Sequence, residues 1–185
     1  YALNDSSEKA LQCFRKSIVM AKRKHDYDTQ CLSLFQQSLI LRDYDPDKAI
    51  LCAKAANSIY NNLKGSKLSN KAYYLLNLAE CISYKDDNPN ICISLARKAI
   101  RYAIQSNDSI TISNSYQDLA SFYGLGGNIT LALKATSESL RYNNKDDFSK
   151  IFALSQFYVL ADSLTQAKRK LSEALPLNIN DSCAY

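Results

Sequence analysis

Apolar residues recur along most of the chain at steps of three and four positions, which is the period of an α-helix. The clearest stretch covers residues 113–142, where Tyr116, Leu119 and Tyr123 share one helical face. A cluster of glycines at 124–127 follows and is expected to break the helix, beginning with Gly124 itself. The pattern therefore predicts a helix that ends in a tight turn.

A second helix is predicted directly after this turn. Asn128 is suited to cap its start, and Ala132, Leu133 and Leu140 repeat the helical step. Ala120 on the first helix and Ala132 on the second are small, so the two helix axes can approach closely where they cross. These residues predict two antiparallel helices packed against each other.

The same two-helix pattern recurs along the chain. A single helix is predicted at about 5–25, pairs at about 29–64, 70–106, 109–143 and 147–175, and the start of a further helix at 181–185. Asp28 is suited to cap the helix that follows it, and Asp45-Pro46 and Asn88-Pro89 mark later starts, because proline at the first helical position leaves no amide unpaired. No stretch shows the alternation typical of a strand. We expect one all-α domain over 1–185, and its unfinished last helix favours a segment of a longer protein.

The order of residues in 113–142 resembles the tetratricopeptide (TPR) motif, a helix-turn-helix unit of about 34 residues. The shared elements are an aromatic residue, Leu, a small residue, an aromatic residue, Gly and then Ala-Leu. The corresponding second-helix positions are separated by 39, 43, 40 and 35 residues; they are Ala10, Ala49, Cys92, Ala132 and Ala167. The resemblance implies divergent, lengthened repeats whose antiparallel helix pairs stack in a right-handed TPR-like superhelix, an α-α solenoid.

Composition and charge add few constraints to this picture. The 185 residues are 46% hydrophobic and 22% charged, which is typical of a folded domain. The net charge of +5 is mild and the basic residues are scattered, mostly over second helices, so we expect no nucleic-acid contact from this segment. No window approaches the roughly 18 uncharged apolar residues of a membrane span.

Residues suited to catalysis or metal binding are few. His25 is the single histidine and stands in a charged helix end, where a solvated side chain is expected rather than a general base. Asp86-Asp87 and Asp146-Asp147 precede helix starts, where carboxylates satisfy free amides. The six cysteines form no C-x-x-C pair, so they are expected to be small thiols buried on apolar stripes such as that of Cys13. The sequence predicts no enzyme, metal or cofactor, and unpaired thiols favour a reducing, cytoplasmic compartment.

The TPR resemblance implies a concave face lined by the first helix of each pair. The residues that it places there are Gln30, Ser33, Gln37, Tyr73, Leu76, Glu80, Asn114, Gln117, Ser121, Ser149 and Gln156. Most are uncharged amides and hydroxyls, which can pair with the backbone of an extended peptide. The row has no Lys or Arg, so the clamp that some TPR domains use for a terminal carboxylate is not expected. Solubility alone would also produce polar side chains on an exposed helix face.

Two functions are compatible with these patterns. The first is a non-enzymatic scaffold that binds a peptide or partner protein through its concave face. The alternative is a sensory, regulatory or self-association segment of a longer signalling protein or transcription regulator. Self-association would use the apolar ends of the repeat array.

Overall fold

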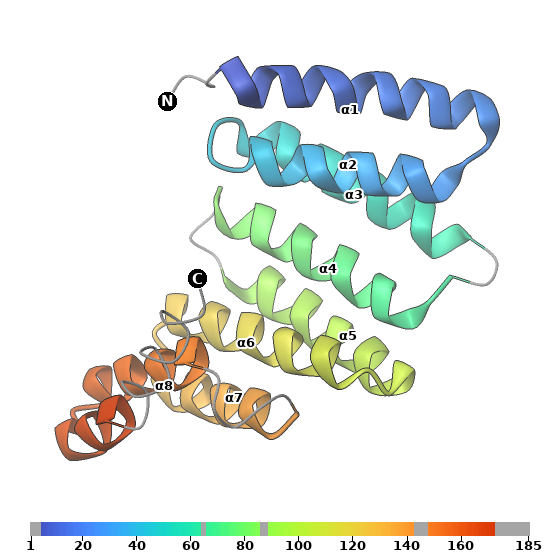
Figure 1. The fold of residues 1–185 in the computed structure, drawn as a ribbon. Helices are drawn as coiled ribbons and strands as arrows, with labels where there is room; N and C mark the ends of the chain where they lie inside the picture. The colour runs from blue at the N-terminus through green and yellow to red at the C-terminus, as the bar shows by residue number, and fades with distance from the viewer. Residues whose placement is uncertain (1–4, 64–65, 86–88, 143–147, 173–185) are drawn as a thin grey trace, which may run out of the picture.

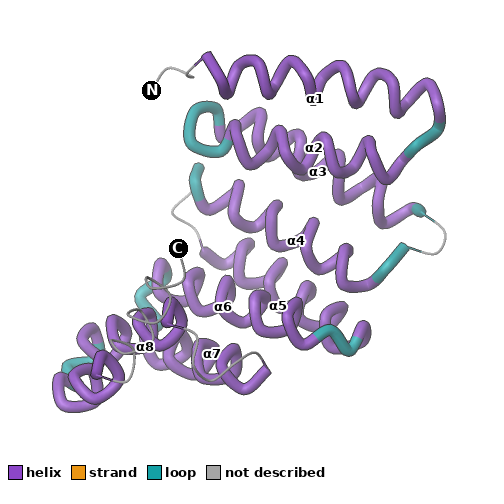
Figure 2. The backbone as a smooth tube through the Cα atoms, viewed as in Figure 1, coloured by secondary structure: helices purple, strands orange, loops and turns teal. Residues whose placement is uncertain are grey.

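The computed structural model describes residues 5–63, 66–85, 89–142 and 148–172, with the side chains of 148–150 left out. Throughout these ranges the chain forms helices joined by turns, without a strand (Figure 2). The helices are α1 (Asp5–Lys24), α2 (Tyr27–Leu41), α3 (Pro46–Asn62), α4 (Leu68–Ser83), α5 (Pro89–Ser106), α6 (Ser109–Leu125), α7 (Ile129–Tyr142) and α8 (Phe148–Leu160). A further helical stretch covers 164–172. The all-α fold class is confirmed.

The helices stack in chain order into an elongated array (Figure 1). α2 packs with α3, α4 with α5 and α6 with α7, and each pair rests on the next. α1 packs against α2 before the first pair, and α8 packs against α7 after the last. The first helices α2, α4 and α6 also contact one another in sequence. They therefore share one side of the array, which we call the inner face.

Side-chain caps start several of these helices. Asp45 accepts a hydrogen bond from the backbone amide of Lys48, with Pro46 as the first helical residue. Asn128 accepts one from the amide of Leu131, as the sequence predicts for the start of α7. Such caps satisfy amides that have no partner within the helix.

The predicted cap at Asp28 is wrong. Asp26 caps α2 instead, accepting hydrogen bonds from the backbone amide and the hydroxyl of Thr29. Asp26 has a non-helical backbone, as a cap requires, whereas Asp28 already lies in the first turn. The expected caps at 86–88 and 146–147 lie outside the described residues.

The glycines after α6 have separate roles. α6 continues through Gly124 to Leu125, so the predicted break at Gly124 is wrong. A Cβ atom on Gly124 would lie 2.9 Å from Cε1 of Phe157, so this glycine permits close packing against α8. Gly126 ends the helix, and Gly127 has a φ of +72°, a conformation that favours glycine.

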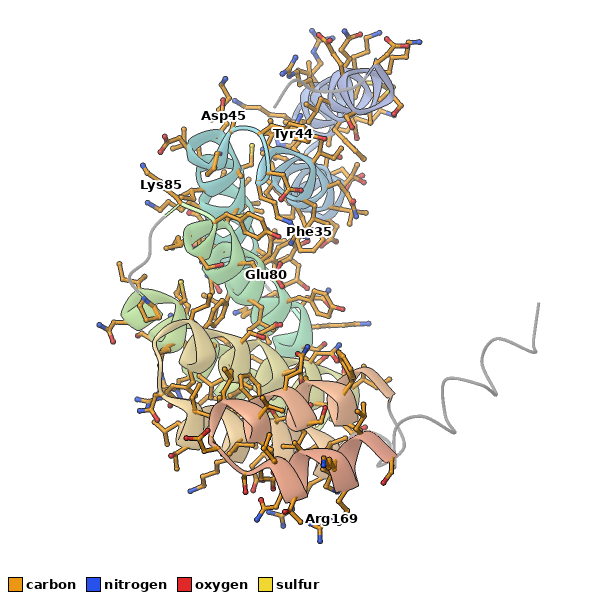
Figure 3. All side chains as sticks on the ribbon, turned by 90° about the vertical axis from the view of Figure 1, so that its left-hand side faces the viewer. Phe35, Tyr44, Asp45, Glu80, Lys85 and Arg169 are labelled. Carbon is orange, nitrogen blue, oxygen red and sulfur yellow. The ribbon has the colours of Figure 1, made fainter. Side chains whose placement is uncertain are left out.

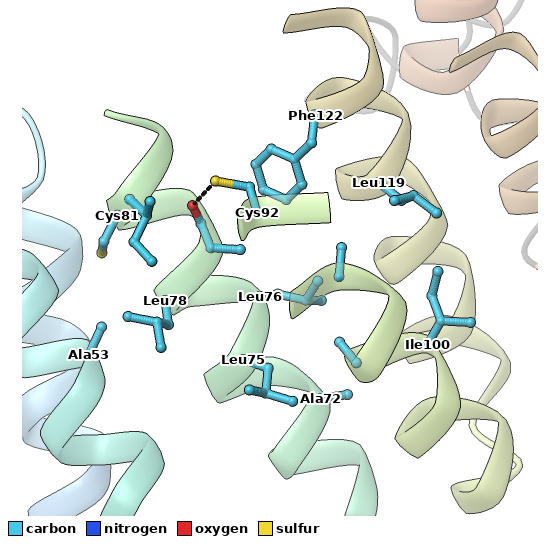
Figure 4. Close-up of a cluster of buried hydrophobic side chains, with 14 of the residues drawn as sticks. Ala53, Ala72, Leu75, Leu76, Leu78, Cys81, Cys92, Ile100, Leu119 and Phe122 are labelled. Carbon is cyan, nitrogen blue, oxygen red and sulfur yellow. Dashed lines mark hydrogen bonds between the residues drawn. The ribbon is translucent and has the colours of Figure 1, made fainter. Parts of the chain in front are cut away.

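Small side chains fill the crossings between helices. Ala120 of α6 and Ala132 of α7 are completely buried, as the sequence predicts. Figure 4 shows the buried cluster around α4, to which Ala53 and Ala72 contribute. In this cluster Cys92 donates a hydrogen bond to the carbonyl of Ala79 over 3.3 Å. Alanine at these points lets the helix axes approach closely.

We expect Ala132→Leu to lower the free energy of unfolding by about 1–3 kcal/mol, because the larger side chain has no space between α6 and α7. Urea unfolding followed by circular dichroism measures the change. Ser137→Leu is the control, since Ser137 is exposed on the same helix. Equal stability of the two variants would contradict tight packing at this crossing.

The described cysteines are free thiols. Cys31, Cys81 and Cys92 are buried as expected, and burial raises the pKa of Cys31 and of Cys81 to about 11, which keeps both thiols protonated. Cys13 is exposed, contrary to the expectation, because α1 is the first helix of the array and packs mainly against α2.

Candidate functional site

The inner face contains a hollow of about 220 Å³ between three helices. Its lining residues are Phe35 from α2, Tyr73, Leu76, Asn77 and Glu80 from α4, and Asn114, Gln117 and Asp118 from α6. We call this site the inner hollow. Phe35 and Glu80 lie near each other in the middle of the array in Figure 3.

Helical spacing brings these side chains to one side. Tyr73, Asn77 and Glu80 follow each other at steps of four and three on α4. Leu76 and Asn77 are buried, whereas Tyr73 is 48% exposed. The amide nitrogen of Asn77 donates a hydrogen bond to the hydroxyl of Ser38 over 2.7 Å. This bond joins α4 to α2 and fixes one side of the hollow.

Glu80 is one of two carboxylates in the inner hollow. It accepts a hydrogen bond from the guanidinium of Arg42 at 2.8 Å. Arg42 also lies over the ring of Tyr84, 5.1 Å from its centre. Burial raises the pKa of Glu80, and the charge of Arg42 opposes this rise. Arg42 is therefore the ionic partner of Glu80, but it only partly offsets the effect of burial on this carboxylate.

Asp118 is the second carboxylate, and no described residue balances its charge. No hydrogen bond or ion pair reaches it from the described residues. Burial, and then the negative charge of Glu80, raise the pKa of Asp118 to about 7. The amide oxygen of the adjacent Gln117 is also buried and accepts no hydrogen bond within the described part of the chain. The hollow thus presents two acceptor groups without donors.

An aromatic groove continues from the inner hollow. The ring centres of Phe35 and Tyr73 are 6.3 Å apart, and those of Phe35 and Tyr74 are 5.8 Å apart in an edge-to-face arrangement. These rings and Leu32 line a space of about 280 Å³, which shares Phe35 and Tyr73 with the hollow. A further space of about 470 Å³ follows, with Leu32 and Tyr74 in common. Together they form an elongated surface.

The structure brings five of the predicted site residues together in the inner hollow: Tyr73, Leu76, Glu80, Asn114 and Gln117. Whether they bind a partner stays a prediction. All five come from α4 and α6, the first helices of two neighbouring pairs.

Ser33 and Gln37 do not lie on this surface, which corrects the prediction for α2. Their side chains are 4% and 6% exposed. The hydroxyl of Ser33 lies 2.8 Å from that of Ser17, and the amide of Gln37 donates to the carbonyl of Leu11. Both side chains are buried because α1 packs against this face of α2.

The other predicted residues also lie outside the inner hollow. Gln30 is half-buried on α2, and Gln156 is exposed on α8. Ser121 is exposed, and its hydroxyl donates to the carbonyl of Gln117. The side chain of Ser149 falls outside the described residues.

Sequence reasoning missed Phe35, Asn77 and Asp118. Asp118 carried a usable signal, because it follows Asn114 by four residues and is the only charged residue in the sequence of α6. Phe35 gave no such signal, because a large apolar residue on a helix is ordinarily part of the core, and Phe35 does pack in part against a buried cluster.

The polar side chains that line the hollow are carboxylates, amides and a tyrosine hydroxyl. Within 5–63, 66–85, 89–142 and 148–172, no cluster of three or more His, Cys, Asp or Glu residues could hold a metal ion. Across the same ranges no helix combines the length and apolar character that a membrane span requires. The donors and acceptors that the hollow does offer are amides, carboxylates and aromatic rings.

No family model and no curated protein sequence matches the chain. Its fold, however, is similar to several solved structures. Nearly identical TPR-like repeats from Podosopora anserina, named for a kinesin light chain, superpose with a TM-score of 0.74 and 10% identity over 95% of this chain and 88% of that one. MamA gives a TM-score of 0.65 and 16% identity over 98% of this chain and 99% of that one. BtubC from P. vanneervenii gives a TM-score of 0.56 and 11% identity over 98% of this chain and 94% of that one.

These likenesses agree with the arrangement of the helices. In this chain the helix pairs stack in chain order and their first helices share one face. The resemblance predicted from residues 113–142 is confirmed at the level of the fold: the chain is a TPR-like solenoid of helix pairs.

Proposed function

We propose that this protein is a non-enzymatic scaffold that binds a peptide segment of a partner protein along its inner face. The inner hollow and the aromatic groove supply the binding surface. The observation that carries this proposal is the elongated set of connected spaces across α2, α4 and α6, lined by aromatic rings and unpaired polar groups.

The chemistry of the lining suits an extended peptide. Asn114 and Gln117 carry amide groups that donate and accept hydrogen bonds, as the backbone of a peptide requires. Tyr73 and Leu32 are large and exposed on the same surface. Their burial by a ligand would supply the apolar contribution to affinity.

The TPR-like likeness supports a scaffold only through the fold, because the identities of 10–16% are too low to carry a partner from one protein to another. The proposal leaves the partner unnamed for this reason. It depends on the inner face of this chain and on the residues that line it.

Tyr73→Ala is expected to weaken a bound peptide at least about tenfold, because central aromatic residues dominate such interfaces. Peptides would be selected from a random octapeptide library on the immobilised chain, and their affinities measured by fluorescence anisotropy. Gln117→Ala tests the amide contribution on the opposite side of the hollow.

Tyr27→Ala is the matched control. Tyr27 is 44% exposed, close to the 48% of Tyr73, but it lies outside the hollow and the groove. If the selected peptides bind wild type, Tyr73→Ala and Tyr27→Ala equally well, the assignment of binding to the inner face is wrong.

A further inference from the structure

We infer that the inner hollow receives a Lys or Arg side chain of the bound peptide, with its cationic group against Asp118 and Glu80. This inference rests on the proposed function, since it names the residue that the inner face would recognise. It predicts a specificity that the TPR-like fold by itself does not provide.

The charges around the hollow favour a cation. Two of its eight lining residues are acidic, and none of the described residues that line it is basic. Arg42, the cation that contacts Glu80 of the hollow, is already bonded to this carboxylate and lies over the ring of Tyr84. The charge of Asp118 thus remains without a counter-charge until a ligand supplies one.

The hydrogen-bonding groups favour the same ligand. The carboxylate of Asp118 accepts hydrogen bonds, and so does the neighbouring amide oxygen of Gln117, which is buried without a donor among the described residues. An ammonium or guanidinium group carries several N–H donors and no acceptor. Both residues line the hollow, so a cationic side chain that enters it brings donors to a surface of acceptors.

The shape of the hollow also suits a long side chain. Its volume of about 220 Å³ lies below the roughly 300–1,000 Å³ of typical small-molecule pockets. Phe35 and Tyr73 stand between the hollow and the aromatic groove. The aliphatic stem of Lys or Arg packs well on such rings while its charged end extends beyond them.

Asp118 is half-buried and lacks the usual structural explanation for such a carboxylate. It caps no helix, since it lies in the middle of α6, and it forms no ion pair within the described residues. A buried charge without a partner destabilises the folded state. Ligand recognition gives this carboxylate a role that packing does not.

The test uses four pools of fluorescent octapeptides, acetylated and amidated so that the chain ends carry no charge. The central residue is Arg, Lys, citrulline or Glu, and the other positions are random. We expect the Arg and Lys pools to bind the chain at least tenfold more tightly than the citrulline pool at pH 8, and the Glu pool to bind most weakly.

Asp118→Asn should remove the preference for Arg over citrulline. Asp43→Asn changes the net charge by the same amount at an exposed position outside the hollow and should keep the preference. The comparison separates a contact at Asp118 from general attraction between a peptide and the protein.

Affinity for the Arg pool should rise roughly tenfold from pH 6 to pH 8. With a pKa of about 7, Asp118 is mostly protonated at pH 6 and mostly ionised at pH 8, and only the ionised form attracts a cation. The other charged or titratable groups around the hollow are Glu80 with its partner Arg42, and Tyr73. The citrulline pool should show little change.

Three outcomes would overturn the inference. Equal binding of the Arg and citrulline pools, with Tyr73→Ala still weakening both, removes the cation preference and leaves the scaffold function standing. An Arg preference that survives Asp118→Asn places the recognition elsewhere. If no pool binds, or if Tyr73→Ala leaves the affinity of every pool unchanged, both the inference and the proposed function are wrong.

Discussion

Asp118→Asn is expected to increase the free energy of unfolding at pH 8 by about 2–4 kcal/mol. The pKa of Asp118 is raised from 3.8 to about 7, and a shift of this size corresponds to roughly 4 kcal/mol for the ionised form. Asparagine has nearly the same shape and no charge, so it removes this cost but keeps a buried polar group. Chemical denaturation at a series of pH values measures the gain.

The sign of the pH dependence follows from the raised pKa. Below pH 3.8 Asp118 is protonated in both the folded and the unfolded chain, so it carries no charge in either state. As the pH rises toward 7, the unfolded chain releases this proton more readily, and the folded chain loses stability relative to it. The difference between Asp118→Asn and wild type should therefore be small near pH 4 and largest at pH 8.

Asp43→Asn serves as the control for this measurement too, because Asp43 is exposed. It should change stability by less than about 0.5 kcal/mol, as surface substitutions usually do. A loss of stability in Asp118→Asn at pH 8 would mean that the carboxylate has a stabilising partner, and the charge argument for the inner hollow would then fail.

The same substitution has opposite expected effects on stability and on binding. Asp118→Asn should make the protein more stable and should also remove its preference for cationic peptides. A loss of binding cannot then be attributed to unfolding. Functional sites often carry residues that are unfavourable for the fold in this way.

Leu75→Ala is expected to lower the free energy of unfolding by about 3 kcal/mol. Leu75 is 2% exposed and belongs to the main cluster of buried apolar side chains, in which it lies on α4 (Figure 4). Its truncation removes apolar contacts and leaves a cavity that rigid neighbouring helices fill only in part. Urea unfolding at pH 7 measures the loss.

Leu51→Ala is the matched control, since Leu51 is 66% exposed on α3 and the chemical change is the same. It should alter stability by less than about 0.5 kcal/mol. If Leu75→Ala costs no more than this control, the cluster around α4 is not the core that stabilises the array.

The fold was predictable because its determinants are local. Helical periodicity, caps such as Asp45 and Asn128, and alanines at helix crossings all act within a few residues of one another. Errors arose where neighbouring residues offered equivalent signals. Asp26 and Asp28 both suit a cap, and Gly124 fits both a helix end and a close packing position.

The candidate site was only partly predictable, because its residues come from three helices. The steps along α4 and α6 placed Tyr73, Glu80, Asn114 and Gln117 on one face, and the structure brings them to one hollow. The same helical spacing, applied to α2, predicted that Ser33 and Gln37 also lie on this face. In the structure α1 packs over both side chains and buries them. Repeats of unequal length do not preserve the register from one helix to the next.

The sequence by itself determined that the chain forms stacked pairs of helices, because period, caps and small residues are properties of short segments. Only the tertiary structure decided which polar side chains are exposed to solvent and which charged groups lack an ionic partner. Burial and pairing depend on helices far apart in the chain, as Arg42 and Glu80 show across two helix pairs. For the same reason, the sequence shows only that Asp118 is the single charged residue of α6, whereas the fold shows that no described residue pairs with its charge.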